Sequence, residues 1–186
     1  MIIQISYGSL WISSHYLEVK LEITGTGTID DPFLFNTKNN FITESYELRV
    51  SDSRKYIKFS GIYLKGLYLN NCENVRISKA RVRCLGLENC SRISILNSDI
   101  TKELRLDKVN MVKVVDSNIK KLFAFSGDQI LISNCEINRI SRKSKALIYR
   151  RDVNTSFWNC YDCEAEIDLF SRFCHNCGSR IIYQEK

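Results

Sequence analysis

The feature that most constrains this chain is an apolar pattern that repeats about every 18 residues through its middle. Such a period is typical of a solenoid, in which each coil packs only against its neighbours. In each apolar column one step is 19 residues long instead of 18. The extra residue lies within residues 101–103, where we expect a corner between two strands. The five apolar columns advance by 18 or 19 residues per step: Leu67, Leu85, Leu104 and Leu122; Leu69, Leu87 and Leu106; Val75, Ile93, Val112 and Ile130; Ile77, Ile95, Val114 and Ile132; Val82, Ile100, Ile119 and Ile137.

Within one coil, the apolar residues come in pairs that are two positions apart, such as Leu67 with Leu69 and Val75 with Ile77. This spacing is that of a strand, because alternate side chains of a strand share a face. The β-branched residues in the columns favour strand as well. Strands this short cannot form hairpins with a constant polarity, so we expect each one to pair with the equivalent strand of the next coil. The sequence therefore predicts an all-β fold, a single-stranded parallel β-helix with about 18 residues per coil.

Smaller residues also recur with this period. Ala80, Ser98, Ser117 and Cys135 form a column that suits a tight inward corner. Asn71 and Asn89 suit a turn, because asparagine tolerates left-handed backbone angles. Four of the eight cysteines are scattered through the repeat, and we expect them to be small packing residues: Cys72, Cys84, Cys90 and Cys135. One ambiguity remains in the repeat, since either Leu122 and Ala124 or Phe123 and Phe125 face inward.

The start of the repeat resembles a known family. The run from Ile23 to Phe35, ITGTGTIDDPFLF, is similar to the opening of NosD-like right-handed β-helix proteins, and the segments 71–82 and 89–100 resemble their repeat. The resemblance, which covers about residues 20–150, implies the right-handed fold of NosD-like and pectate-lyase-like solenoids. The spacing of 2, 6, 2 and 5 residues between apolar sites also differs from the hexapeptide pattern of left-handed β-helices. Many functions occur on this fold, so the resemblance implies no particular function.

The C-terminal segment carries the clearest chemical motif. Two C-x-x-C pairs are separated by ten residues, and they predict one structural Zn²⁺ held by Cys160, Cys163, Cys174 and Cys177. Four thiolates close a tetrahedral site without an open position, so this zinc would stabilise the fold rather than catalyse a reaction. The segment resembles the short zinc ribbons that end many archaeal and bacterial proteins. We therefore divide the chain into an N-terminal cap at 1–36, containing Trp11 and Tyr16, a β-helix at 37–150, a linker at 151–156 and a zinc ribbon at 157–186.

The positive charge of the chain is concentrated at one junction. The formal net charge is +6, and residues 139–151 contain six basic residues and no acid. This junction is a candidate anion- or nucleic-acid-binding segment, in which Tyr149 offers a ring for base stacking. Its residues are Arg139, Arg142, Lys143, Lys145, Tyr149, Arg150 and Arg151. The opposing interpretation is that these residues only solvate the end of the solenoid.

The sequence gives little indication of catalysis. No Ser/His/Asp arrangement is apparent around the two histidines, and we attribute the acids that come close to the repeat period, such as Glu88 and Asp107, to chance. No apolar run approaches the roughly 20 residues of a spanning helix, and no signal peptide is apparent, so we expect a cytoplasmic protein. The favoured function is a non-catalytic scaffold that docks onto a protein or ribonucleoprotein complex, without a membrane or a small-molecule substrate. The alternatives are RNA or ribosome binding through the junction and, less favoured, a carbohydrate-active enzyme or lectin.

Overall fold

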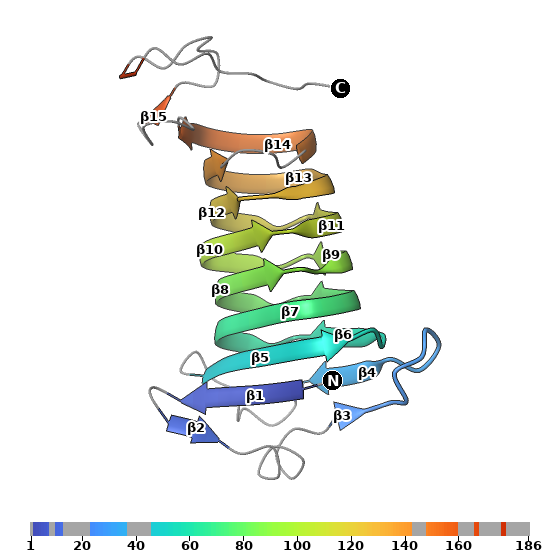
Figure 1. Ribbon diagram of the computed structural model, residues 1–186. Coiled ribbons are helices and arrows are strands. Elements are labelled where there is room, and N and C mark those ends of the chain that lie inside the picture. Colours follow the sequence, from blue (N-terminus) through green and yellow to red (C-terminus); the bar gives the residue numbers. More distant parts are fainter. Residues whose placement is uncertain are drawn as a thin grey trace.

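The computed structural model describes residues 2–7, 10–12, 23–36, 46–142, 148–159, 166–167 and 176–177. These residues form strands, turns and connecting segments without a helix. The strands wind into a parallel β-solenoid of about five turns with about 18 residues per coil (Figure 1). The predicted all-β parallel solenoid is therefore confirmed, whereas its right-handed winding stays a prediction.

Two parallel ladders run along the solenoid, and its long strands bend from one ladder into the other. The first ladder consists of β5 (Tyr46–Ser53), β7 (Tyr63–Ser78), β8 (Arg81–Glu88), β10 (Asp99–Asp107), β12 (Asn118–Ala124), β13 (Gly127–Arg142) and β14 (Ile148–Asn159). The second ladder consists of β4 (Phe33–Asn36), β6 (Ile57–Ser60), β7, β9 (Ser91–Leu96), β11 (Val109–Val115), β13 and β14. Each coil thus contributes one rung to each ladder.

The predicted apolar columns form the core. Leu67 pairs with Leu85, Leu85 with Leu104, and Leu104 with Leu122, and all four side chains are buried. The other four columns are in register and buried in the same way. The extra residue of the long step lies where it was expected, since the register shifts after Ile100. It forms a bulge within β10, however, and does not lie between two strands, because the strand continues through it.

Residues with a left-handed backbone recur at the turns of the solenoid, at three positions per coil in its middle part. Asn71 and Asn89 occupy one such column, as their type predicts, with φ values of 52° and 50°. The same angles occur at residues with less tolerance for them, such as Lys108 and Met111, with φ values of 50° and 53°. The corner geometry is therefore imposed by the stacking of the coils, because it persists where the side chain does not favour it.

The small column at one corner is a hydrogen-bonded ladder. The Ser98 Oγ accepts a hydrogen bond from the Ala80 N–H at 3.2 Å and donates one to the Leu96 carbonyl at 2.8 Å. The Ser117 Oγ repeats this arrangement with the Ser98 N–H and the Val115 carbonyl. Buried backbone groups are thereby satisfied at a corner that is too tight for a large side chain.

Three of the four scattered cysteines are packing residues, as predicted. Cys72, Cys90 and Cys135 are buried, and their thiols donate to backbone carbonyls of their own or the preceding coil. Burial raises the pKa of the Cys135 thiol. Cys84 differs from these three, because it is only half-buried and pairs in register with Gly66 and Glu103 on the outer side of the sheet.

Antiparallel strands flank both ends of the solenoid. β1 (Ile2–Tyr7) pairs with β5 and with β2 (Leu10–Ile12), which contains Trp11, while β3 (Ile23–Thr24) pairs with β4. At the other end, β15 (Glu166–Ile167) pairs with the last residues of β14. These strands occupy edges that would otherwise be open for pairing with another chain.

The expected cap and the expected linker both include residues of solenoid strands. Phe35, from the expected cap, is buried and pairs with Phe59, so β4 already belongs to the first rung. The expected linker at 151–156 lies within β14. Tyr16 lies outside the described residues. In the described part of the chain, no helix is long and apolar enough to cross a membrane.

Candidate binding face

The predicted zinc ligands lie mostly beyond the part of the chain that the structure describes. Cys177 is exposed in a turn with Asn176, and Cys160, Cys163 and Cys174 lie outside the described residues. Within the described residues, no group of three or more His, Cys, Asp or Glu side chains is arranged to hold a metal ion. β14 ends at Asn159, directly before the first expected ligand, and β15 brings part of the spacer between the two cysteine pairs alongside β14.

The structure distributes the basic junction over two ladders. Arg139 lies near the end of β13 on the first ladder, where it pairs with Phe157, and Arg142 ends the same strand. Tyr149, Arg150 and Arg151 begin β14 on the second ladder, and they pair with Leu131, Ile132 and Ser133, respectively. Ile132 is buried, so the register places Arg150 in a column that belongs to the core in the preceding coil. Lys143 and Lys145 lie outside the described residues.

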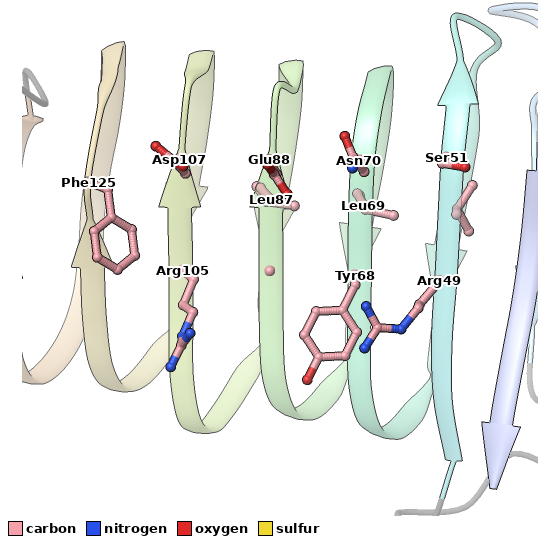
Figure 2. Close-up of a pocket in the computed structure, with 12 residues that line it drawn as sticks. Arg49, Ser51, Tyr68, Leu69, Asn70, Leu87, Glu88, Arg105, Asp107 and Phe125 are labelled. Carbon is pink, nitrogen blue, oxygen red and sulfur yellow. The ribbon is translucent and has the colours of Figure 1, made fainter. Parts of the chain in front are cut away.

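A hollow that bears on function lies elsewhere, on the outer side of the first ladder, which we call the groove face. It has a volume of about 480 Å³ and is lined by residues from successive rungs, from β5 to the end of β12 (Figure 2). One column of paired outward positions runs through it, and it contains Arg49, Tyr68, Gly86, Arg105 and Phe123. Unlike the core columns, this one changes residue type at every rung.

The hollow exists because two outward positions are glycines. A Cβ atom on Gly86 would lie 2.8 Å from the ring of Tyr68, and one on Gly66 would lie 2.6 Å from it. The absence of these atoms lets the Tyr68 ring lie along the sheet and leaves space between Tyr68 and Arg105. Figure 2 shows these two side chains projecting from β7 and β10, the strands that flank β8. Any larger residue at position 86 would fill this space.

Tyr68 lies in a charged and partly buried environment. The guanidinium of Arg49 lies over its ring at 4.4 Å from the ring centroid, a cation–π contact. Burial raises the pKa of the Tyr68 hydroxyl, the negative charge of Glu47 raises it further, and Arg49 opposes these effects. Tyr68 therefore stays neutral and able to donate a hydrogen bond to a bound molecule well into the alkaline range.

Hydrogen-bond acceptors lie along one side of the groove face. Asn70, Glu88 and Asp107 occupy paired positions on three successive rungs. The Oδ1 of Asp107 accepts a hydrogen bond from the Ser126 Oγ at 2.7 Å, which fixes its orientation. Glu88 is exposed. The structure places both carboxylates, which we attributed to chance, on adjacent rungs of the hollow.

Aromatic rings occupy the end of the groove face nearest β13. The rings of Phe123 and Phe125 are stacked with centroids 6.3 Å apart, and the Arg105 guanidinium lies 5.8 Å from the centroid of Phe123. Both phenylalanines are partly exposed, while Leu122 and Ala124 are buried. This resolves the ambiguity in the repeat in favour of Leu122 and Ala124 as the core residues. The outward phenylalanines are then available for contact with a partner.

Sequence reasoning missed the groove face, although two signals for it were present. Gly86 and Tyr68 occupy equivalent positions in the period, and a glycine next to an aromatic residue in an outward column is the pattern that leaves a hollow. Comparison with protein-family models, with curated proteins and with solved structures finds no match to this chain.

Proposed function

We propose that this protein is a non-catalytic binding protein that docks a macromolecular partner on its groove face. The observation that carries the proposal is the hollow between Tyr68 and Arg105, in which aromatic, basic and acidic side chains face the solvent together. Arginine and aromatic residues are enriched at the energetic centres of protein interfaces. An outer surface that served only for solubility would not require two glycines to keep such a hollow open.

The shape of the groove face favours an extended partner. Its side chains come from five rungs, β5, β7, β8, β10 and β12, which are linked by continuous pairing. Rungs are about 4.8 Å apart, so the face is roughly 19 Å long from the first rung to the last. The hydrogen-bonded ladder beneath it is rigid, so little conformational entropy is lost when a partner binds.

A second candidate, a glycan-cleaving enzyme, is favoured by one observation. Glu88 and Asp107 lie on adjacent rungs beside Arg105, and paired carboxylates with a nearby cation are the usual groups of glycoside cleavage. One observation counts against it. Asp107 accepts a hydrogen bond from the Ser126 Oγ, which itself accepts one from the Lys108 N–H, so one oxygen of this carboxylate already has a structural role at the corner. We therefore favour binding over catalysis.

We also propose that the C-terminal segment is a zinc ribbon that closes the last coil. Cys160, Cys163, Cys174 and Cys177 would hold one structural Zn²⁺ as four thiolate ligands. The antiparallel pairing of Trp158 with Ile167 supports the proposal, because it folds the spacer back onto the strand that precedes the first cysteine pair. The exposed turn at Cys177 is consistent with a knuckle at this position. The expected measurement is one zinc per chain, lost when Cys160 and Cys163 are replaced by serine.

The test of the proposed function is to fill the hollow. We would capture partners from the cells that make the protein with the wild type, with Gly86→Trp and with Ser94→Trp, which changes an outward position of the second ladder. Circular dichroism and thermal unfolding would establish that all three are folded. A partner that the wild type and Ser94→Trp retain and Gly86→Trp loses supports the proposal. If all three proteins recover the same partners, the groove face is not the docking surface.

A further inference from the structure

A second feature, which we call the cationic ridge, follows one side of the groove face. It lies where the first ladder bends, and it continues through five successive rungs from β7 to β13. Its members are Lys65, Arg83, Lys102, Lys120, Lys121 and Arg139. The register supports this alignment, since the buried residues that precede Lys65, Arg83 and Lys120 are paired in one column and Lys121 pairs directly with Arg139.

Three charges of the ridge are uncompensated within the described part of the chain. Arg83, Lys102 and Lys120 are exposed and form no ion pair with any residue in the described ranges. The nearby acids are already engaged, since Glu47 contacts Lys65 at 3.4 Å and Glu103 contacts Arg105 at 3.0 Å. Arg83, Lys102 and Lys120 therefore form a line of positive charge that is open to an anionic partner.

The three parts of the groove face are arranged side by side across the ladder. The cationic ridge forms one margin, the flat groups Tyr68, Phe123 and Arg105 lie in the middle, and the acceptors of Glu88 and Asp107 form the other margin. From this order we infer that the groove face binds a single-stranded nucleic acid, an inference that rests on the proposed function. The phosphates would follow the ridge, the bases would stack on the rings and guanidinium groups, and base amino groups would donate to the carboxylates.

The acidic margin distinguishes this partner from other polyanions. An anionic polysaccharide or an acidic peptide carries charge along its whole width, so it would meet Glu88 and Asp107 with its own negative charges. A nucleic-acid strand is negative on one side and carries neutral hydrogen-bond donors on the other. Unpaired bases are needed for this arrangement, because the π-faces and amino groups of a duplex are already engaged.

The test is direct binding to a fluorescein-labelled, mixed-sequence 12-nucleotide RNA and to DNA of the same sequence. Fluorescence anisotropy would be measured over a series of KCl concentrations. The wild type should bind, with an affinity that falls as the salt concentration rises. Replacing Lys120 and Lys121 together by glutamine should reduce the slope of log K against log[salt] by about 1.4, because each lost phosphate contact on a single strand contributes about 0.7.

Two further variants separate this site from general electrostatic attraction. Lys58→Gln with Arg76→Gln removes two cations at outward positions of the second ladder, and it should leave the salt slope unchanged. Phe123→Leu retains every charge but removes a stacking ring, and it should weaken binding by about tenfold. Thermal unfolding would establish that each variant is folded.

Three outcomes would overturn the inference. The first is no saturable binding of either oligonucleotide at low salt, and the second is an equal effect of the two double variants on the salt slope. The third is tight binding that heparin and polyglutamate abolish to the same extent, with an affinity for the oligonucleotide that Phe123→Leu does not change. The last outcome would assign the ridge to other polyanions. These failures are distinguishable from a failure of the proposed function. If neither oligonucleotide binds while Gly86→Trp still loses a partner that the wild type retains, docking on the groove face stands and its partner is not a nucleic acid.

Discussion

Leu104 and Arg105 are neighbours in the chain, but they belong to two regions of the molecule that follow different rules. Leu104 lies in the interior, where every rung repeats the same kind of residue, and it is fully buried. Arg105 lies on the groove face, in a column that contains arginine, tyrosine, glycine and phenylalanine on other rungs. The interior is uniform because each coil must fill the same cross-section. The groove face is free to vary because its side chains face solvent, and this variation produces a site.

The largest expected effect comes from substitutions at these two neighbouring residues. Leu104→Ala should lower the free energy of unfolding by about 2–5 kcal/mol, since it leaves a cavity in a close-packed column. Arg105→Ala should change the free energy of unfolding by less than about 1 kcal/mol, because its ion pair with Glu103 is a surface pair. Urea denaturation of the two variants measures the difference. Similar losses of stability in both would show that the groove face is part of the folding core.

A smaller loss of stability is expected at a pair of serines. Ser98 faces inward, and Ser98→Ala removes the acceptor of the buried Ala80 N–H at a cost of about 1–3 kcal/mol. Ser94 is the outward counterpart, between Arg76 and Lys113, and Ser94→Ala should be close to neutral. Thermal or urea unfolding would measure both variants. The ladder at the small column would be energetically unimportant if Ser98→Ala destabilised no more than Ser94→Ala.

The interior was predictable from the sequence for the reason that makes it uniform. Leu67, Leu85 and Leu104 recur because burial at a fixed register requires an apolar residue of similar size at each rung. The bulge in β10 was locatable because the columns before and after it keep their spacing. The corner column containing Asn71 and Asn89 was also apparent, since asparagine has a side-chain reason to occupy it.

The groove face was not predictable by the same reasoning. Its hollow depends on two glycines, Gly66 and Gly86, and on the direction that Tyr68 takes beside them. A search for repeated features cannot find a site that arises from a break in the repeat. The choice between Phe123 and Leu122 as the inward residue was also undecidable from composition, because both alternatives are apolar. Pairing with Leu104 on the preceding rung decides it.

The corners lie at the boundary of the two regions. A substitution at one of them is expected to stabilise the fold. Met111 has a φ of 53° and 46% of its surface exposed, so it is in a left-handed conformation with little packing in return. Met111→Gly should raise the free energy of unfolding by about 0.5–1 kcal/mol, since glycine adopts this angle without a steric penalty. Met111→Ala should change it little, because alanine keeps the penalty. Urea denaturation would measure both variants. Destabilisation by glycine would mean that the Met111 side chain contributes packing that its exposure does not indicate.

The smallest effect is a pH dependence that belongs to the groove face. The pKa of Tyr68 is raised in the folded state by burial and by Glu47, whereas in the unfolded chain it is about 10. The folded state therefore holds its proton more tightly, and this contribution to stability is complete below about pH 10 and is lost as the pH rises through the folded pKa. Tyr68→Phe should remove that alkaline loss from the unfolding curve.

NMR titration of the tyrosine rings provides an independent check, because it measures how each charged neighbour changes the pKa of Tyr68. Glu47→Gln should lower the pKa of Tyr68, because a negative charge next to the hydroxyl is removed. Arg49→Met should raise it, because the guanidinium over the ring favours the phenolate. If neither substitution moves the pKa, the Tyr68 hydroxyl is solvated independently of its neighbours in the hollow. The charges of Glu47 and Arg49 would then not act on Tyr68. In that case the groove face would differ little from an ordinary solvated surface, and the electrostatic basis of the proposed binding would be lost.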